Sequence, residues 1–209
     1  MADIEHKDIV DAQRHEPKGA STATVNYVLK SDGDGTTSWE DPNSLVDVGN
    51  LEFESQLIAF SVASSQQPVA QDVALKVEFG AAQGTIANPV MVDVAGKVTF
   101  NEAGAYRVRT VLQYGRTGIT SQADLFARAL INGVQVGNSV GASVDTAGIL
   151  IANSIESWLN VPAGAELEYE IVRDSSGTNA GGLFSATPTA AGWNFSPSAS
   201  LTIDRIVGA

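Results

Sequence analysis

Apolar and polar residues alternate along most of the chain from residue 57 onward, which is the pattern of strands that bury one face. The segment around Tyr106 and Val108 shows this most clearly, because Arg107 and Arg109 take the alternate positions. Turn-forming residues, most strongly Asn132-Gly133, separate the alternating segments. The pattern predicts ten strands, over residues 57–62, 74–79, 90–94, 97–100, 105–114, 125–131, 134–136, 149–161, 167–173 and 198–207.

Helical periodicity is almost absent, and the spacing of the strands is typical of a sandwich of antiparallel sheets. We therefore expect an all-β fold, in which residues 57–209 form a ten-stranded antiparallel sandwich. Residues 178–182 are rich in small and polar side chains and are predicted to be a loop.

The first 20 residues are polar and have no sustained period, so they cannot bury enough surface to fold alone. We expect them to form an extended anchor that becomes ordered on a partner, with contacts from Ile4, His6, Ile9, Val10, Arg14, His15 and Pro17.

Residues 21–43 have the pattern of a small β-hairpin. Tyr27 and Leu29 alternate as in a strand, a Gly- and Asp-rich turn follows at 31–35, and Trp39 lies in the return arm. The predicted parts are thus an anchor at 1–20, a hairpin at 21–43, a linker at 44–56 and the sandwich at 57–209.

Composition narrows the classes of partner. The net charge of −12 argues against nucleic acid, because phosphate contacts need clustered Lys and Arg. There is no cysteine for disulfides or zinc–thiolate sites, and no apolar run approaches the ~20 residues that span a bilayer. Only 17% of residues are charged, so association that buries surface is favoured. The N-terminus has no apolar signal region, which indicates folding in a cytoplasm.

The residues that could carry chemistry do not form a catalytic pattern. The two histidines, His6 and His15, lie in the polar N-terminal segment, where no scaffold would hold them rigidly. Asp32 and Asp34 lie in a turn sequence, with a calcium loop as the less favoured alternative. Three glutamates, Glu166, Glu168 and Glu170, have the spacing of a solvated strand face. We predict no enzyme activity, no cofactor and no metal.

Five segments, in order along the chain, resemble the globular-head domain of the first complement component and its tumour-necrosis-factor-like relatives. They are Ile58-Ala59-Phe60-Ser61-Val62, Val77-Glu78-Phe79, residues 96–108 (GKVTFNEAGAYRV), residues 129–136 (ALINGVQV) and residues 161–167 (VPAGAEL). The resemblance covers roughly residues 57–207. It implies a jelly roll that forms a tight homotrimer, with aromatic and aliphatic residues around the threefold axis.

On this resemblance, the large aromatic residues are expected in the core or at the trimer interface: Phe60, Phe79, Phe100, Tyr106, Tyr114, Trp158 and Tyr169. Trp193 and Phe195 lie in a Gly-, Pro- and Ser-rich stretch and are either the start of a packed strand or a loop that touches a ligand. The arginines of the central strands, such as Arg109, are expected to pair between subunits with carboxylates such as Glu156 or Asp124.

The segment from His15 to Ser21, together with Tyr27-Val28-Leu29 and the turn that leads to Trp39, resembles the start of tailed-bacteriophage virion proteins. This implies a capsid decoration or head-fibre protein, made in the host cytoplasm and attached to the virion by its N-terminal segment. It would aid particle stability or host attachment. The alternative is a tail-fibre tip that binds a host-surface glycan or protein through loops at 115–124, 137–148 and 174–196. A carbohydrate-active enzyme is a third, less favoured alternative.

Overall fold

The computed structural model describes residues 28–31, 37–40, 52–118 and 121–207, and the chain divides into two compact units. In the first unit, β1 (Val28–Ser31) pairs with β2 (Thr37–Glu40) in antiparallel register, with Leu29 opposite Trp39. These strands lie within the predicted hairpin. The predicted anchor at 1–20 and the turn at 32–36 lie outside the described residues.

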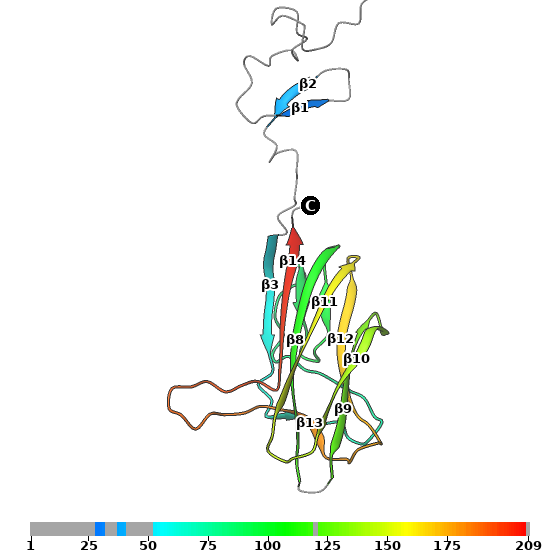
Figure 1. Ribbon diagram of the computed structural model, residues 1–209, viewed down its shortest axis with the longest axis vertical. Helices are drawn as coiled ribbons and strands as arrows, with labels where there is room; N and C mark the ends of the chain where they lie inside the picture. The colour runs from blue at the N-terminus through cyan, green and yellow to red at the C-terminus, as the bar shows by residue number, and fades with distance from the viewer. Residues whose placement is uncertain (1–27, 32–36, 41–51, 119–120, 208–209) are drawn as a thin grey trace, which may run out of the picture. The chain divides into compact units, whose positions relative to one another are not determined.

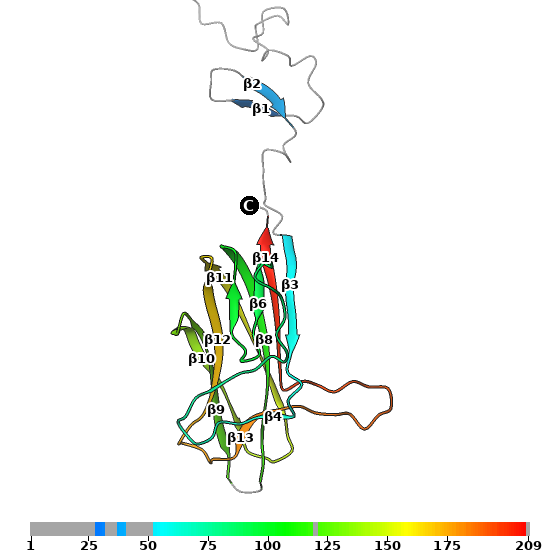
Figure 2. The ribbon, with the colours of Figure 1, turned by 180° about the vertical axis from the view of Figure 1, so that it is seen from behind.

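The second unit, Leu51–Val207, is a sandwich of two six-stranded antiparallel sheets (Figures 1 and 2). The β8 sheet has the order β3 (Glu52–Phe60), β14 (Ala199–Val207), β8 (Gly104–Arg116), β13 (Gly181–Phe184) and β4 (Ser65–Gln66), with β11 (Ile151–Val161) also paired to β8. The β9 sheet has the order β10 (Val134–Val144), β9 (Ala123–Ile131), β12 (Ala165–Arg173), β7 (Val98–Phe100) and β6 (Val90–Val92), with β5 (Leu75–Lys76) also paired to β12.

The path between the sheets is that of a jelly roll. The chain crosses from one sheet to the other between β4 and β5, β7 and β8, β8 and β9, β10 and β11, β11 and β12, and β12 and β13, while β9 and β10 form a hairpin within one sheet. The all-β, antiparallel sandwich expected from the sequence is therefore confirmed. Within the described part of the sandwich ten strands have three or more residues, and β4 and β5 are two-residue ladders.

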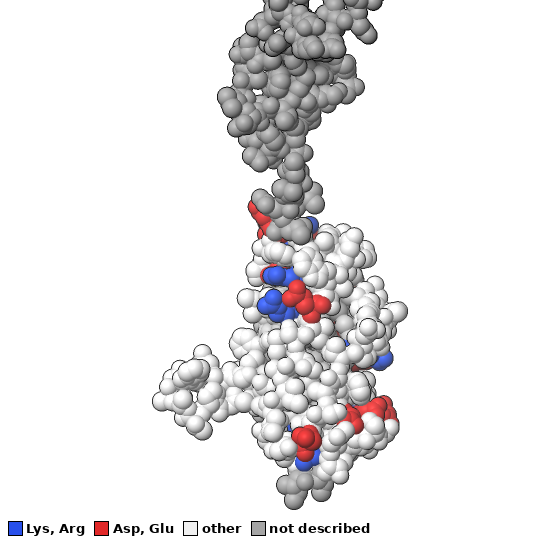
Figure 3. Space-filling view, viewed as in Figure 1, with Lys and Arg blue, Asp and Glu red and all other residues white. Residues whose placement is uncertain are grey.

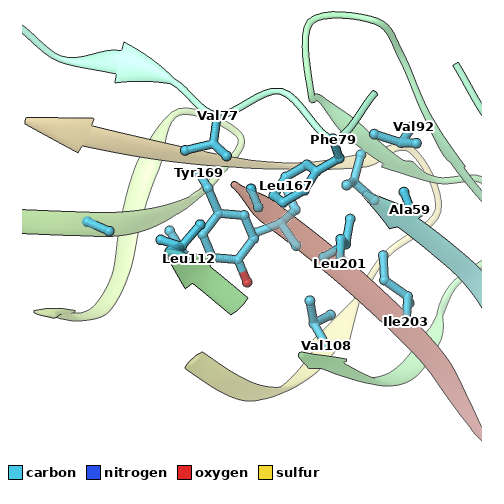
Figure 4. Packing of buried hydrophobic residues seen from close by; sticks show 14 of the residues in the cluster. Ala59, Val77, Phe79, Val92, Val108, Leu112, Leu167, Tyr169, Leu201 and Ile203 are labelled. Atoms are coloured by element: carbon cyan, nitrogen blue, oxygen red, sulfur yellow. The ribbon is translucent and has the colours of Figure 1, made fainter. Parts of the chain in front are cut away.

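The core lies between the sheets and is built from the inward positions of both (Figure 4). Val108, Leu201 and Ile203 of the β8 sheet face Leu167 and Tyr169 of the β9 sheet, and all five are buried. Tyr169 also meets the ring of Phe79 edge to face, with the two centroids 6.0 Å apart. Edge-to-face pairs of this kind stabilise a fold beyond the free energy gained from burial, so the Tyr169 ring is expected to contribute strongly to the stability of the core.

Several strand boundaries differ from the sequence prediction. The predicted strand at 134–136 is longer in the structure, because β10 stays paired with β9 as far as Val144, so that much of the loop expected at 137–148 is strand. β3 begins at Glu52, so the last part of the predicted linker at 44–56 is a strand. The reason is its partner, because β14 continues to Val207 and pairs with Glu52 across a bulge at Ile203/Asp204. Such pairing is set by residues about 150 positions away and leaves no local pattern in the sequence.

The predicted strand 74–79 forms a ladder only at Leu75–Lys76. The backbone of Glu78 is bound instead by the side chain of Gln66, whose Nε2 donates to the Glu78 carbonyl (3.0 Å) and whose Oε1 accepts from the Glu78 amide (2.8 Å). A buried side-chain amide thus replaces a neighbouring strand. The predicted loop at 178–182 overlaps β13, which begins at Gly181.

Candidate functional site

The outward face of the β8 sheet carries large apolar side chains that the sandwich itself does not cover. Ile58 is 63% exposed, Trp158 55%, Phe60 46% and Phe53 39%. They come from β3 and β11, at the two edges of the sheet beside β14 and β8. We call this surface, defined by Phe53, Ile58, Phe60 and Trp158, the β8 face.

The register shows why these residues share one face. Ile58 lies beside Thr202, and Phe60 lies beside Ser200, two positions further along the same strands. Trp158 pairs with Arg107 across β11 and β8, and its ring contacts Phe53 edge to face at 5.7 Å. The β8 face therefore reaches across the sheet from β3 to β11.

The charges on the β8 face are neutralised within the chain. The Arg107 guanidinium lies 4.1 Å above the Phe53 ring and forms an ion pair with Asp204 (2.6 Å), while Arg109 forms one with Glu156 (3.2 Å). The sequence prediction placed the Arg109–Glu156 pair between subunits. The structure forms it within one chain, because the two residues are directly opposite in the β8–β11 ladder. The face thus offers apolar surface with little net charge.

A long loop projects from the sandwich between β13 and β14, and we call residues 185–197 the arm (Figures 1 and 2). Every residue from 187 to 196 is exposed, and Trp193 is 73% exposed. Trp193 directly follows a turn in which its amide donates to the Ala190 carbonyl (3.4 Å), with Gly192 at a φ of 83°. Positive φ at this position is typical of a type II turn and favours glycine.

The outward face of the β9 sheet is different in kind. Its three glutamates each form an ion pair with a neighbouring cation, Lys97–Glu166 (2.7 Å), Lys76–Glu168 (2.5 Å) and Arg128–Glu170 (2.7 Å). The hydrogen bond from Lys97 to Glu166 is the main reason why the pKa of Lys97 is raised. This is the solvated, charged face that the spacing of the glutamates predicts.

A hollow of about 250 Å³ lies on this same outward face. Arg128 donates from Nε and Nη2 to a single oxygen of Glu170, Oε2, so that the other oxygen lies outside the pair. The polar and aromatic lining residues are Asp72, Phe126, Arg128, Gln135, Ser139 and Glu170. The hollow thus places hydrogen-bonding groups beside an exposed ring, and it is somewhat smaller than the pockets that usually hold small-molecule ligands.

A buried carboxylate organises the loops at one end of the sheets. Asp124 accepts hydrogen bonds from Ser143 (2.6 Å) and Gln122 (2.8 Å) at Oδ1 and from Ser176 (3.0 Å) at Oδ2. These bonds, that from Ser143 first, lower the pKa of Asp124 because they stabilise its charged form. Asp124, on β9, therefore ties β10 to the residue before β9 and to the loop after β12 within the chain. Its expected arginine partner from another subunit stays a prediction.

The aromatic residues predicted for the core or trimer interface fall into two groups. Phe79, Phe100, Tyr106, Tyr114 and Tyr169 are fully buried inside the sandwich. Burial raises the pKa of the Tyr114 and Tyr169 hydroxyls. Phe60 and Trp158 lie on the β8 face, and Trp193 and Phe195 lie on the arm. The structure thus brings Phe60 near Phe195, with ring centroids 6.2 Å apart.

Two residues of the β8 face, Phe53 and Ile58, were missed by sequence reasoning. A signal for Ile58 is present, because Leu57, Ile58, Ala59 and Phe60 are apolar at both strand parities. A strand that is apolar on both sides is typical of one covered on both faces. Phe53 has no comparable signal, because it lies in the segment predicted to be a linker.

No group of three or more potential metal-ligating side chains gathers among the residues that the structure describes. In the same part of the chain there is also no helix long and apolar enough to cross a bilayer. The predicted anchor contacts, Ile4, His6, Ile9, Val10, Arg14, His15 and Pro17, lie outside the described residues.

No family model matches the chain, and no curated protein is similar to it. Among solved structures, the chain is similar to Eiger TNF from S. frugiperda, with 13% sequence identity and a TM-score of 0.45. The similarity covers 75% of this chain and 94% of that one. The jelly-roll assignment rests on the strand order and register given above, and a likeness this distant carries no argument about function.

Proposed function

We propose that this protein is a non-enzymatic structural protein that assembles as a homotrimer through the β8 face. We further propose that its N-terminal segment attaches the trimer to a bacteriophage virion as a capsid decoration or head fibre. The observation that carries the assembly is the exposure of Phe53, Ile58, Phe60 and Trp158 together on one sheet face. Soluble monomers rarely leave a continuous apolar patch of this kind in water.

The chemistry of the face favours a second copy of the same chain. The chain carries a net charge of −12, so two copies repel each other, and this repulsion is smallest at close range where they meet at a surface without net charge. Arg107 and Arg109 are neutralised by Asp204 and Glu156 on the β8 face, which makes it such a surface. The number three comes from the resemblance of residues 57–207 to tumour-necrosis-factor-like domains.

Sedimentation equilibrium of the full-length chain tests the assembly. We expect a mass three times the 21.7 kDa of one chain. Ile58→Glu places a carboxylate in the proposed interface, and we expect it to weaken association at least about a hundredfold, on the order of 3 kcal/mol. Val134→Glu is the matched control, because Val134 is similarly exposed (68%) but lies on β10 in the other sheet. A monomeric wild type, or equal effects of both variants, would contradict the proposal.

The attachment is tested separately on particles. Deletion of residues 1–20 is expected to leave the trimer intact and to abolish its binding to virions, because three weak anchors act together. Immunogold electron microscopy of particles from the source lysate, with antibody against residues 57–209, locates the protein. Label on heads would support decoration, label on tail tips would favour the receptor-binding alternative, and unlabelled particles would refute the virion role.

The hollow on the β9 sheet favours glycan binding as a second candidate function. Carboxylate, guanidinium, amide and hydroxyl groups can all bind sugar hydroxyls, and the Phe126 ring can cover an apolar sugar face. Ser139, which lines the hollow, falls in the 137–148 segment that the sequence predicted to be a receptor-binding loop, although it lies in β10. A glycan array with the wild type and with Phe126→Ala tests this function. Binding that Phe126→Ala removes would support it, and absence of binding would contradict it.

A further inference from the structure

We propose that the arm binds a second copy of this chain, with Trp193 packed against the neighbouring protomer. This inference rests on the self-association proposed above and adds a contact that the β8 face alone does not provide. It concerns residues 185–197, which contribute only their two ends to the sandwich.

The composition of the arm indicates a partner rather than solvent. No Asp, Glu, Lys, Arg or His occurs from Ser175 to Ile203. In a chain with a net charge of −12, this is a long uncharged stretch, and the projecting loop carries no charge in Figure 3. A tryptophan that is 73% exposed on such a loop leaves a large apolar area in water. Tryptophan is also the residue type most enriched among those that dominate binding energy at protein interfaces.

The base of the arm is held firmly, so the direction of the arm is fixed by the sandwich. Ala186 and Ser196 exchange two backbone hydrogen bonds (3.0 and 2.7 Å). The side chain of Gln113, on β8, donates to the Phe184 carbonyl (2.7 Å) and accepts from the Ser196 hydroxyl (3.0 Å). A loop anchored in this way loses less conformational entropy on binding than a free one, which favours a specific contact.

The position of the arm points to a second copy as its occupant. Phe195 contacts Phe60, so the arm begins at the β8 face and is continuous with the surface proposed for assembly. The arm projects on the side of the sandwich where β3 forms the sheet edge (Figures 1 and 2). In a cyclic trimer the contacts are head to tail, so a feature projecting from one side of a protomer meets a different side of the next. The arm is placed to make that contact.

The test uses the full-length chain with a photo-crosslinking residue, p-benzoylphenylalanine, in place of Trp193. Irradiation of the assembled protein is expected to give covalent dimers and trimers. The matched control carries the same residue in place of Ile86, which is 83% exposed and lies on a loop distant in sequence from the arm. We expect the control to stay largely uncrosslinked.

Substitution measures how much the contact contributes. Trp193→Ala is expected to raise the concentration at which the assembly half-dissociates at least tenfold, while Ile86→Ala leaves it unchanged. The arm lies outside the core, so circular dichroism and the thermal unfolding of the monomer should be unaffected by Trp193→Ala.

The outcomes separate this inference from the proposed function. If the wild type is a monomer, the assembly through the β8 face and the arm contact both fail. If the wild type assembles and Ile58→Glu disrupts it, but position 193 gives no intermolecular crosslink and Trp193→Ala has no effect, the arm contact alone is overturned. Crosslinked trimers together with weakened assembly of Trp193→Ala would establish it.

Discussion

The two outward faces of the sandwich expose different kinds of side chain to water. On the β9 sheet, Glu166, Glu168 and Glu170 form a row, and each is paired with a cation in or directly before another strand of that sheet. On the β8 sheet the corresponding area holds Phe53, Ile58, Phe60 and Trp158. One chain therefore carries a face covered by ion pairs and a face with large exposed apolar side chains.

The comparison teaches that charge pairs alone do not distinguish the faces, because both have them. Arg107 and Arg109 are paired on the β8 face just as Lys76 and Arg128 are on the other. What differs is the apolar area between the pairs. On the β9 sheet the ion pairs themselves cover the outward face. On the β8 face they neutralise charges that lie beside exposed rings, as Arg107 does above Phe53.

The largest expected effect comes from the layer that both faces share. Tyr169→Ala removes a fully buried ring that packs on Phe79, and we expect it to lower the free energy of unfolding by about 3–5 kcal/mol. Urea unfolding followed by tryptophan fluorescence measures this loss. The substitution should destabilise both sheets, because the ring packs between them. A loss below about 1 kcal/mol would contradict the packing role assigned to this ring.

A smaller effect, confined to association, is expected from substitutions that compare one exposed ring on each outward face. Trp158→Ala on the β8 face is expected to weaken self-association by about 2 kcal/mol per interface and to change monomer stability little. Phe126→Ala is the counterpart on the β9 sheet, where Phe126 is 41% exposed, and should leave association unchanged. Sedimentation velocity over a dilution series compares them. If Phe126→Ala dissociates the assembly more than Trp158→Ala, the wrong face has been assigned.

The pH dependence of stability is expected to come from Asp124, at the start of β9, rather than from the ion pairs on either outward face. The pKa of Asp124 is lowered in the folded state, so its contribution is present above its unfolded pKa, near 4, and is lost as the pH falls through its folded pKa. Asp124→Asn should therefore cost on the order of 1 kcal/mol at neutral pH and flatten the decline of stability below about pH 4. Thermal unfolding from pH 2 to 7 tests this, and an unchanged acid decline in the variant would count against it.

The smallest expected effect is on the charged face. Lys76→Ala breaks the ion pair with Glu168, and the Lys76 side chain is 52% exposed. Exposed pairs contribute little because water and salt screen them, so we expect a change below about 1 kcal/mol and no change in association. Chemical unfolding with and without added salt is the measurement. A large loss of stability in Lys76→Ala would mean that the outward face of the β9 sheet is also an interface.

Much of the fold could be predicted from local patterns. Leu167, Tyr169 and Ile171 alternate in the sequence, and all three are buried. Asn132-Gly133 indicates a hairpin, and both residues take the positive φ angles (50° and 77°) that a tight type I′ turn requires. The start of β3 could not be predicted, because it depends on pairing with the distant end of β14.

The site was harder to predict than the fold. An apolar strand position faces either a core or a partner, and the sequence pattern is the same in both cases. Phe60 and Trp158 were therefore grouped with Tyr106 and Tyr114, although only the latter two are buried within the chain. Separating them required the register, which places Trp158 opposite Arg107 and away from the core.

The pairing of Glu52 with Val207 has a practical consequence for engineering. The chain enters β3 and leaves β14 at the same end of the sandwich, so a reporter fused beyond Val207 would leave the sandwich at the end where β3 begins. A peptide meant for presentation away from that end belongs elsewhere. The exposed stretch around Thr146 and Gly148, between β10 and β11, is a suitable insertion point, because it lies outside both ladders and an added epitope there would leave the strand pairing intact.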